Sequence, residues 1–470
     1  MDTIAAIATG PAAAAIGVVR VSGQGCFACC DRLFRAASQT PFSRQEPRKM
    51  VFGEMLDAEG RVIDRGLAVR FPAPHSYTGE DSAELHCHGS PVVLRELLSA
   101  LFAAGARQAG PGEFTKRAFL NGRLDLTQAE AVIDLIDAET AAAARNAAAQ
   151  LEGGLRRVLE PIQETLLDIA SRFYAVVDYP DEDIQDVNPA EIARAMASAE
   201  DALTRLLAAC RRGQVLKKGV RTAIVGLPNA GKSSLLNALA GYDRCLVTDI
   251  PGTTRDTVEE SVLCGGVLLR LIDTAGLRET EDTVEQLGVE RSRRAMEEAE
   301  LILLVDDTLA APETPIPPAL RETFLRLLNE VGRGRAPWIL VASKRDLTGQ
   351  SAGSIGAIGA PDWRCPAAYV SLSALTGEGM EDLEKAVADL FPAGDSGEAG
   401  SLLTDHRQED AARRARSALR RGRAALEDGL TPDAALTDVE EALDALGELT
   451  GRTAREELVS AVFSRFCVGK

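Results

Sequence analysis

The sequence lacks an uninterrupted apolar run long enough to span a bilayer, which takes about 20 residues. Its first residues, Met1 to Ile4, lack the basic start and apolar core of a secretory signal peptide. The nine cysteines are odd in number and include no pair of C-x-x-C motifs of the kind that binds zinc. We therefore expect a cytoplasmic protein with reduced thiols, no disulfide framework and no membrane partner.

An excess of basic residues is also missing. The net charge is −18, which argues against a general nucleic-acid binder with a basic face. This charge still allows a local basic patch, or a complex in which a partner supplies most of the positive surface. The length of 470 residues is sufficient for about three domains.

The pattern along the chain predicts α/β and α segments in alternation. Residues 1–120 are mixed α/β, with short β-rich runs at Gly17 to Val21 and Gly66 to Phe71. Residues 121–217 and 395–470 have the three- and four-residue apolar spacing of helices. Residues 218–394 alternate strands with helices, and their apolar runs near 222–225, 268–272, 301–305 and 338–342 favour a parallel-rich sheet covered on both faces. We predict one discontinuous helical domain with this α/β domain inserted into it.

A phosphate-binding loop follows the first of these strands. Gly226-Leu227-Pro228-Asn229-Ala230-Gly231-Lys232-Ser233 matches the G-x-x-x-x-G-K-S pattern between a strand and a helix. Its glycines allow backbone N–H groups to surround phosphate oxygens, and the helix N-terminus adds positive potential. We expect Lys232 to reach the β- and γ-phosphates and Ser233 to bind Mg²⁺.

Two later motifs complete a nucleotide site. Asp273-Thr274-Ala275-Gly276 ends a predicted strand, which places Asp273 for the magnesium shell and Gly276 near the γ-phosphate. In Ser343-Lys344-Arg345-Asp346 a carboxylate can accept hydrogen bonds from guanine N1–H and N2–H₂, and adenine lacks this pair of donors. Ser343 replaces the usual asparagine, so we expect the loss of one supporting contact and weaker affinity. Ser373 and Ala374 fit the supporting guanine loop.

The switch motif lacks the glutamine that orients water in Ras-like proteins. Leu277 stands at that position and cannot hydrogen-bond the attacking water. Another group must take this role, and the sequence shows no evident arginine finger.

Several segments together resemble the MnmE (TrmE) family of GTPases, which modify the tRNA wobble uridine with a folate-derived carbon. The similar segments span almost the whole chain: Gly17 to Gly23, Ser76 to Asp81, His86 to Gly89, Pro111 to Phe114, Ala118 to Leu126, Asp249 to Asp256, and Phe466 to Lys470. The combination of a terminal F-C-V-G-K with a phosphate loop is highly specific. The resemblance implies an N-terminal folate-binding domain and a Ras-like G domain.

The resemblance also implies a potassium-dependent GTPase whose G domains dimerise across the nucleotide. It gives Asn229, Thr248, Ile250 and Thr253 as K⁺ ligands, Ser233 and Thr254 as Mg²⁺ ligands, and Glu285 as the acid that positions water. Without the resemblance, an acid in a charged segment, such as Glu285, is more often a solvated surface residue. The implied GTP-binding residues are Asn229, Ala230, Gly231, Lys232, Ser233, Ser234, Thr248, Asp249, Ile250, Pro251, Gly252, Thr253, Thr254, Asp273, Thr274, Ala275, Gly276, Lys344, Asp346, Ser373 and Ala374.

A folate site is implied in the N-terminal domain, with Arg20, Glu84, Arg123 and Lys470 as ligands of a 5-formyl- or 5,10-methylene-tetrahydrofolate. The segment Ala12 to Ala15 departs from the glycine-rich turn of the family, which is expected to stiffen or reshape the pocket edge. Cys467 is either a catalytic thiolate or a buried cysteine that fills a helix end. His86 and His88 could share a strand face as metal ligands, but a strand edge near the pocket is favoured because no third ligand is evident.

The implied partners are a second copy of the chain, tRNA, and the FAD protein MnmG in a heterotetramer or larger complex. The favoured function is addition of a carboxymethylaminomethyl or aminomethyl group to C5 of the wobble uridine. One alternative is a ribosome-assembly or regulatory GTPase without carbon-transfer chemistry. Another is a folate-dependent methyltransferase with a vestigial G domain, which the intact Lys232, Ser233 and Asp273 argue against.

Overall fold

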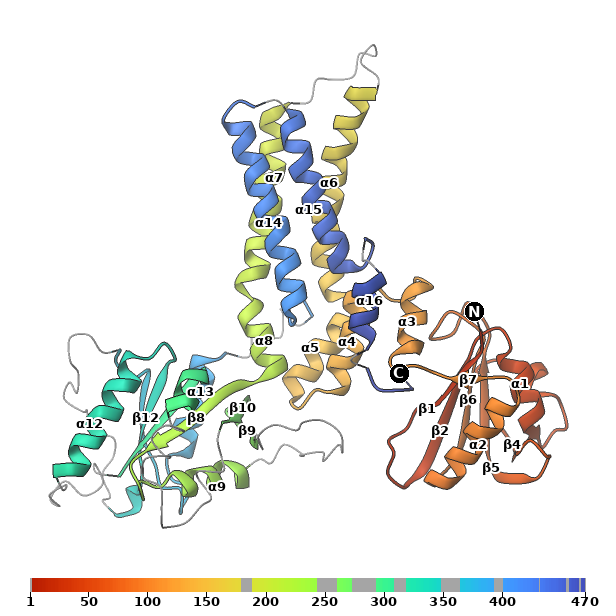
Figure 1. Cartoon of the computed structure of the whole chain (residues 1–470), viewed down its shortest axis with the longest axis horizontal. Coiled ribbons are helices and arrows are strands. Elements are labelled where there is room, and N and C mark those ends of the chain that lie inside the picture. Colours follow the sequence, from red (N-terminus) through yellow and green to blue (C-terminus); the bar gives the residue numbers. More distant parts are fainter. Residues whose placement is uncertain are drawn as a thin grey trace. The chain divides into compact units, whose positions relative to one another are not determined.

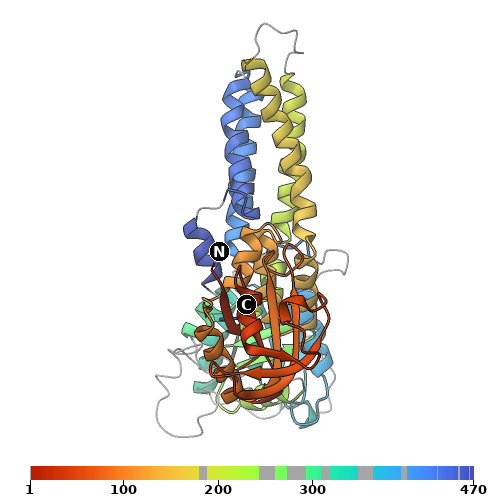
Figure 2. The same cartoon turned by 90° about the vertical axis from the view of Figure 1, so that its right-hand side faces the viewer.

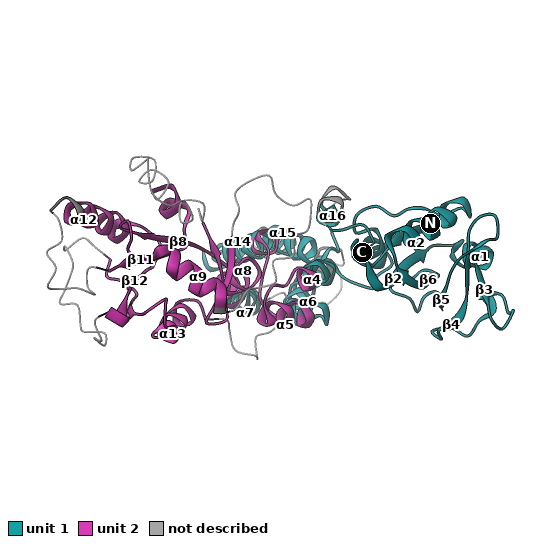
Figure 3. Cartoon of the chain, turned by 90° about the horizontal axis from the view of Figure 1, so that it is seen from below, with its two compact units in different colours: residues 1–133, 150–203, 410–470 teal, residues 134–149, 204–409 magenta. Residues whose placement is uncertain are grey.

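A computed structural model describes residues 2–178, 188–242, 260–272, 293–307, 318–347, 364–392, 400–430, 432–453, 456–464 and 466–469. The chain divides into two compact units, shown in different colours in Figure 3. Unit 1 comprises residues 1–133, 150–203 and 410–470, and unit 2 comprises residues 134–149 and 204–409. Each unit therefore gathers segments that are far apart in the sequence. The boundaries of the four segments expected from the sequence stay predictions.

The N-terminal part of unit 1 is a seven-stranded sheet in the order β3-β4-β5-β6-β2-β1-β7. Its strands are β1 (Ile4–Ile7), β2 (Ala14–Ser22), β3 (Phe34–Ala36), β4 (Val51–Leu56), β5 (Val62–Phe71), β6 (Ser82–Gly89) and β7 (Arg107–Gln108). Neighbouring strands are antiparallel except β1 and β7, which are parallel. The β-rich runs at Gly17 to Val21 and Gly66 to Phe71 lie within β2 and β5, so both predicted strands are confirmed.

The two faces of this sheet are covered differently. Helices α1 (Cys26–Leu33) and α2 (Pro91–Ala103) pack on one face, where Val19, Val21 and Leu85 are buried. The short helix η1 (Phe42–Arg44) adds Phe42 to the same core. Helix α3 (Glu113–Leu120) places Phe114 against Ile4 and Ala6. Because side chains alternate along a strand, Ile4 and Ala6 lie on the face opposite Ala5 and the main core. Val18 and Arg20 of β2 and Glu84 and His86 of β6 lie on that second face and are half-buried.

Four long helices of unit 1 run side by side (Figures 1 and 2). They are α6 (Gly154–Asp178), α7 (Pro189–Ala208), α14 (His406–Glu427) and α15 (Pro432–Thr450). Arg421 of α14 pairs with Asp438 of α15, and Arg423 pairs with Glu200 of α7. Buried alanines on α14, including Ala411, Ala415 and Ala418, allow close approach of the neighbouring helices.

Two shorter helices connect this bundle to the N-terminal sheet within unit 1. They are α4 (Leu126–Ile136) and α16 (Glu456–Phe463), and their apolar side chains form one core with Phe463 and Phe466. Phe119 of α3 packs against this core and lies 6.2 Å from Phe463 between ring centroids. The end of the chain is therefore anchored beside the N-terminal sheet.

Unit 2 is built on a six-stranded sheet in the order β13-β12-β11-β8-β10-β9. Its strands are β8 (Val220–Gly226), β9 (Glu260–Cys264), β10 (Val267–Leu271), β11 (Leu301–Asp306), β12 (Trp338–Ala342) and β13 (Ala368–Ser371). All neighbours are parallel except β9 and β10. The four strands predicted from apolar runs are confirmed as β8, β10, β11 and β12.

Helices cover both faces of the unit 2 sheet, as predicted. Helices α9 (Lys232–Tyr242) and α13 (Met380–Leu390) supply Leu235, Leu239 and Leu383 to one core, whereas α12 (Pro318–Arg333) supplies Leu328 and Val331 to the other. Helices α5 (Ala141–Leu151) and α8 (Cys210–Lys218) also belong to this unit. Burial on both faces explains the near-continuous apolar strands.

Candidate functional site

The predicted phosphate loop connects the carboxyl end of β8 to the start of α9 (Figure 1). The Lys232 ammonium folds back over this loop and donates hydrogen bonds of 3.0 Å to the Gly226 carbonyl oxygen and 2.7 Å to the Leu227 carbonyl oxygen. A Cβ atom at Gly226 would lie 2.3 Å from the Val305 carbonyl oxygen, so the close approach of β8 and β11 requires glycine here.

Burial within the loop lowers the pKa of Lys232, and the nearby Asp307 carboxylate acts against this shift. A partly buried ammonium beside a helix N-terminus favours an anion as its partner. Asn229 is exposed and has a positive φ of 62°, while Ser233 and Ser234 lie exposed in the first turn of α9.

The predicted guanine loop follows β12 and contacts the phosphate loop directly. The Ser343 hydroxyl donates a 2.6 Å hydrogen bond to the Ala230 carbonyl oxygen, and the Ser343 N–H donates to the Asp306 carbonyl oxygen at 2.9 Å. The short side chain of Ser343 therefore reaches the phosphate loop, and the expected loss of one contact relative to asparagine stays a prediction. Whether GTP affinity is weakened stays a prediction.

Asp346, the predicted guanine reader, lies in the short helix η3 (Arg345–Leu347). The buried Ser373 hydroxyl donates a 2.7 Å hydrogen bond to Asp346 Oδ1, and Ser373 Oγ in turn accepts the Thr376 N–H. Ser373 therefore orients the carboxylate, and Ala374 follows it in the same loop. One carboxylate oxygen is engaged, and the carboxylate keeps further acceptor positions for a base.

Asp307 is a site residue that the sequence reasoning missed. Its Oδ2 atom lies 2.6 Å from the Lys344 Nζ atom, and it also acts on Lys232. The sequence did contain a signal for this residue, because an acid directly follows the buried strand β11. This position lies at the carboxyl edge of the sheet, which also carries the loops after β8, β12 and β13. Asp307 therefore connects the two lysines of the site electrostatically.

Many predicted nucleotide and metal residues fall outside the described part of the chain. They are Thr248, Asp249, Ile250, Pro251, Gly252, Thr253, Thr254, Asp273, Thr274, Ala275, Gly276, Leu277 and Glu285, together with the folate candidate Lys470.

In unit 1 the folate candidates Arg20 and Glu84 are cross-strand partners on β2 and β6. Arg20 donates from Nε and Nη2 to Glu84 Oε1, at 3.1 Å and 3.0 Å. The Arg20 guanidinium also lies over the Tyr77 ring at 5.6 Å and over the Phe114 ring at 5.7 Å. Two rings and a carboxylate therefore fix its orientation.

The segment Ser76 to Asp81 is held against α3 by side-chain contacts. Tyr77 Oη is 2.9 Å from Thr115 Oγ1, and Asn121 donates a 2.7 Å hydrogen bond to the Thr78 carbonyl oxygen. A Cβ at Gly79 would approach the Arg123 Cγ atom at 3.3 Å, which places the exposed Arg123 beside this segment. Within the described residues, no hydrogen bond or ion pair joins Arg123 to the Arg20–Glu84 pair.

A buried ion-pair network lies next to these candidates. Arg117 contacts Asp2 at 2.7 Å and both Glu80 and Glu113 at 3.0 Å. Although burial would raise the pKa of Glu113, hydrogen bonds from Arg107, the Gly110 N–H and Arg117 outweigh it and lower the pKa to about 2. The network fixes α3 relative to the segment that carries Tyr77. No local sequence pattern predicts this network, because its members are brought together by the fold.

Cys467 is exposed, and its carbonyl oxygen accepts a hydrogen bond from the Gly112 N–H at 3.3 Å. Val468 forms a β-bridge with Pro111. The alternative of a buried cysteine that fills a helix end is therefore wrong, because the last turn is filled by Phe463 and Phe466 instead. An exposed thiol is accessible to chemistry, and its catalytic role stays a prediction.

The His86-Cys87-His88 segment lies on β6, which has β5 on one side and β2 on the other. The expectation of a strand edge is therefore wrong. His88 is exposed and its Nδ1 atom lies 3.0 Å from Asp64 Oδ1. The part of the chain that the structure describes contains no group of three potential metal ligands.

The eight described cysteines form no disulfide with one another. Cys26 and Cys29 lie one turn apart in α1 and are buried in the core of the N-terminal sheet, where burial raises the pKa of both thiols. The reduced state expected of the thiols stays a prediction.

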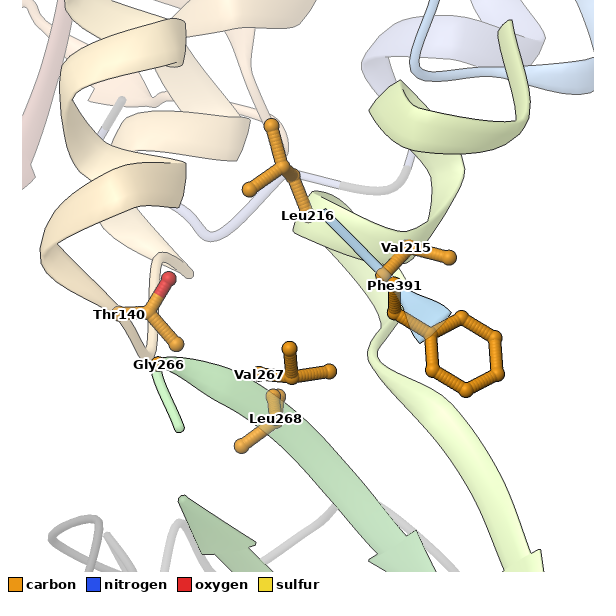
Figure 4. A pocket seen from close by; sticks show the side chains of 7 residues that line it. All are labelled: Thr140, Val215, Leu216, Gly266, Val267, Leu268 and Phe391. Carbon is orange, nitrogen blue, oxygen red and sulfur yellow. The ribbon is translucent and has the colours of Figure 1, made fainter. Parts of the chain in front are cut away.

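A small apolar cavity of about 10 Å³ lies elsewhere in unit 2, lined by residues that include Val215, Leu268 and Phe391 (Figure 4). It has room for about one water molecule and is too small for a nucleotide. Across the described residues no helix has the length and apolar character needed to cross a membrane.

Comparison with known proteins gives family matches over nearly the whole chain. The family model described as "GTP-binding protein TrmE N-terminus" matches residues 3–123, and the "MnmE helical domain" matches residues 126–467. The tRNA modification GTPase MnmE of Symbiobacterium thermophilum is 43% identical, and that of Thermus thermophilus is 42% identical; each alignment covers 100% of this chain and 99% of the relative. A solved G domain of the T. maritima FeoB iron transporter aligns with 36% of this chain and over 97% of its own length, at 23% identity and a TM-score of 0.23.

Proposed function

The chain belongs to the MnmE family, whose curated members are named tRNA modification GTPases, and on that premise we propose that it hydrolyses GTP to drive modification of the tRNA wobble uridine. The observation that carries this proposal is the contact between Ser343 and Ala230, which joins a base-reading loop to a phosphate loop. Both loops lie at the carboxyl edge of parallel strands, where open α/β sheets bind ligands.

GTP would be held at its two ends by this chain's own residues. Lys232 and the loop N–H groups would bind the phosphates, and Asp346, oriented by Ser373, would accept the paired N–H donors of guanine. Ser233, with Thr254 and Asp273, would hold Mg²⁺, which supplies charge neutralisation at the phosphates.

We infer a potassium site from the family and from the exposed Asn229 at the loop. Asn229, with Thr248, Ile250 and Thr253, would hold K⁺, which stabilises negative charge that develops between the β- and γ-phosphates. Glu285 would position the attacking water in place of the glutamine that Leu277 displaces. The dimer expected across the G domains would complete this site.

The N-terminal sheet supplies groups that suit a tetrahydrofolate. Glu84 would accept N–H donors of the pterin ring, and Arg20, Arg123 and Lys470 would bind the carboxylates of the glutamate tail. When bound, a 5-formyl- or 5,10-methylene-tetrahydrofolate supplies the one-carbon unit, and the exposed Cys467 is the candidate thiol. The pairing of Arg20 with Glu84 supports a preformed site whose polar groups are already oriented.

A FAD-containing MnmG-like partner would contribute the redox chemistry and much of the tRNA contact. The net charge of −18 supports a complex in which the partner supplies much of the positive surface that binds tRNA. The assembly would add a carboxymethylaminomethyl or aminomethyl group to C5 of the uridine.

The test is mass spectrometry of bulk tRNA from cells that lack this protein. We expect the wobble-uridine modification to disappear and to return with the wild-type chain but not with Lys232→Ala. Retained modification would overturn the proposal and favour the alternative function of a ribosome-assembly or regulatory GTPase. That alternative also predicts no binding of 5-formyl-tetrahydrofolate to the purified protein.

A further inference from the structure

The side chain of His86 contains a buried polar atom without a hydrogen-bond partner. Its Nε2 atom forms no hydrogen bond with the described residues. Buried polar groups in proteins are almost always paired, so an unpaired one points to a water molecule or a ligand that completes it. His86 therefore marks a place where a polar group from outside the chain is expected.

The position of this atom is defined by Glu84. The two residues are separated by one residue on β6, so their side chains share a face of the sheet. His86 Nε2 lies 3.4 Å from Glu84 Oε2, but the two atoms are not aligned as a hydrogen bond. Arg20 donates both its hydrogen bonds to the other oxygen, Oε1. Glu84 Oε2 thus accepts no hydrogen bond within the described part of the chain.

The neighbours of this pair are apolar on both sides. Val18 of β2 and Leu67 of β5 are the cross-strand partners of His86. Tyr77 and Phe114 enclose Arg20 at the next position along the sheet. A flat heterocycle could lie across these side chains and present one polar edge to Glu84 and His86.

The hydrogen-bonding groups of Glu84 and His86 define which polar edge of a heterocycle can bind them. A 2-amino-4-oxo pterin presents an amino donor, a ring N–H donor and a carbonyl acceptor in sequence. A carboxylate can accept the two donors, and the adjacent acceptor then requires a donor beside that carboxylate. The Nε2–H tautomer of histidine supplies such a donor.

We propose that His86 is a further ligand-binding residue, which donates from Nε2 to the 4-oxo group of the pterin whose N–H donors bind Glu84. This rests on the folate site proposed above and goes beyond it by assigning recognition of the 4-oxo group. His86 thereby selects 4-oxo folates over 4-amino analogues, in which a donor replaces the acceptor. Selection follows because a mismatched polar pair in a desolvated site is costly.

The experiment is a binding titration of the full-length protein with 5-formyl-tetrahydrofolate and with its 4-amino analogue, by calorimetry. In the wild type the 4-oxo ligand should bind more tightly. His86→Ala should weaken 4-oxo binding by roughly tenfold and change 4-amino binding by less than roughly twofold. His86→Gln, which restores an N–H donor, should recover part of the loss.

His88→Ala is the matched control, because His88 lies on the same face of β6 but is exposed and paired with Asp64. It should bind both ligands like the wild type. Circular dichroism of each variant tests for unfolding, and His86→Gln carries the test if His86→Ala does not fold. If neither His86 variant alters the preference while the wild type binds folate, the assignment of His86 is wrong and the folate site stands. If the wild type binds no folate, both fail.

Discussion

The Ser343 hydroxyl lies 2.6 Å from the Ala230 carbonyl oxygen and joins the base-reading loop to the phosphate loop. Ser343→Ala removes this contact and leaves a buried carbonyl oxygen with one partner fewer. We expect GTP binding to weaken by about 1 kcal/mol, or roughly fivefold, because a buried hydrogen bond of this kind contributes about that much. Titration with a fluorescent GTP analogue measures it. Ser371→Ala is the control, since the Ser371 hydroxyl makes no hydrogen bond to the described residues. Equal affinity for the two variants would show that the contact is unimportant.

Asp346 is the residue that we expect to select guanine. Asp346→Asn should lower GTP affinity by about 2 to 4 kcal/mol, because it loses charge-assisted acceptance from two donors. The same change should improve binding of xanthosine triphosphate, whose carbonyl at position 2 accepts from the new amide. Competition binding with the two nucleotides checks this. Ser373→Ala should weaken GTP binding without changing the preference, because Ser373 orients the carboxylate. A retained preference of Asp346→Asn for GTP would contradict the assignment.

Asn229 is the described side chain that we expect to hold potassium. In the wild type, GTP turnover should rise when K⁺ replaces Na⁺. Asn229→Ala should remove this rise and lower GTP turnover in K⁺ by roughly tenfold to a hundredfold. The reason is that the variant cannot fix a cation at the charge that develops between the β- and γ-phosphates. Steady-state phosphate release in the two salts measures it. Asn237→Ala, an exposed asparagine on α9, should keep the full response. A wild type that is indifferent to the cation would exclude the mechanism.

Glu113 makes the stability of the N-terminal sheet depend on pH. The pKa of Glu113 is about 2 in the folded protein, compared with its ordinary value of 4.5. The carboxylate therefore binds more protons in the unfolded chain. Its contribution is therefore present above about pH 4.5 and is lost as the pH falls toward 2. After allowance for solvent screening we expect Glu113→Gln to lower stability by about 1 to 2 kcal/mol at neutral pH, and by progressively less in acid.

Amide hydrogen exchange of β1 and α3 between pH 3 and pH 7 measures this local stability. Glu46→Gln serves as the comparison, because Glu46 pairs with Lys49 at the surface and should change little. A Glu113→Gln effect that stays constant across this range would rule out the linkage.

Cys467 is expected to be needed for carbon transfer to tRNA but not for GTP hydrolysis. Because its side chain is exposed, Cys467→Ser should change the free energy of unfolding by less than about 0.5 kcal/mol. GTP turnover should also persist, whereas tRNA modification in complemented cells should be lost. Cys365→Ser, another exposed cysteine, should leave all three unaffected. Full modification by Cys467→Ser would leave this thiol without a role in carbon transfer.

Local sequence signals predicted the unit 2 sheet well. Apolar runs marked β8, β10, β11 and β12, and the spacing from Gly226 to Ser233 marked a strand, loop and helix. These features depend on residues that are near one another in the sequence. The parallel order of the strands then brings their loops to one edge, which is why the positions of Lys232 and Asp346 could be anticipated.

Contacts across long separations could not be derived from the sequence in the same way. Ser343 and Ala230 are 113 residues apart, and their contact depends on the order in which β8, β11 and β12 assemble in the sheet. Arg20 and Glu84 are 64 residues apart, and their pairing depends on the register of β2 with β6. A shift of one residue would turn Arg20 to the other face. The exposure of Cys467 likewise depends on Phe463 and Phe466, whose rings fill the core at this end of the chain.

The hydrogen bond from Gly112 to Cys467 connects residues roughly 350 positions apart in the chain. At a synthesis rate of about 5 to 20 residues per second, Gly112 leaves the ribosome on the order of half a minute before its partner exists. During this interval the N-terminal sheet can fold, but the surface that Cys467 and Val468 cover stays open. The nascent chain therefore passes through a stage in which this surface is free for chaperones, and Cys467 and Val468 close it once they have been translated.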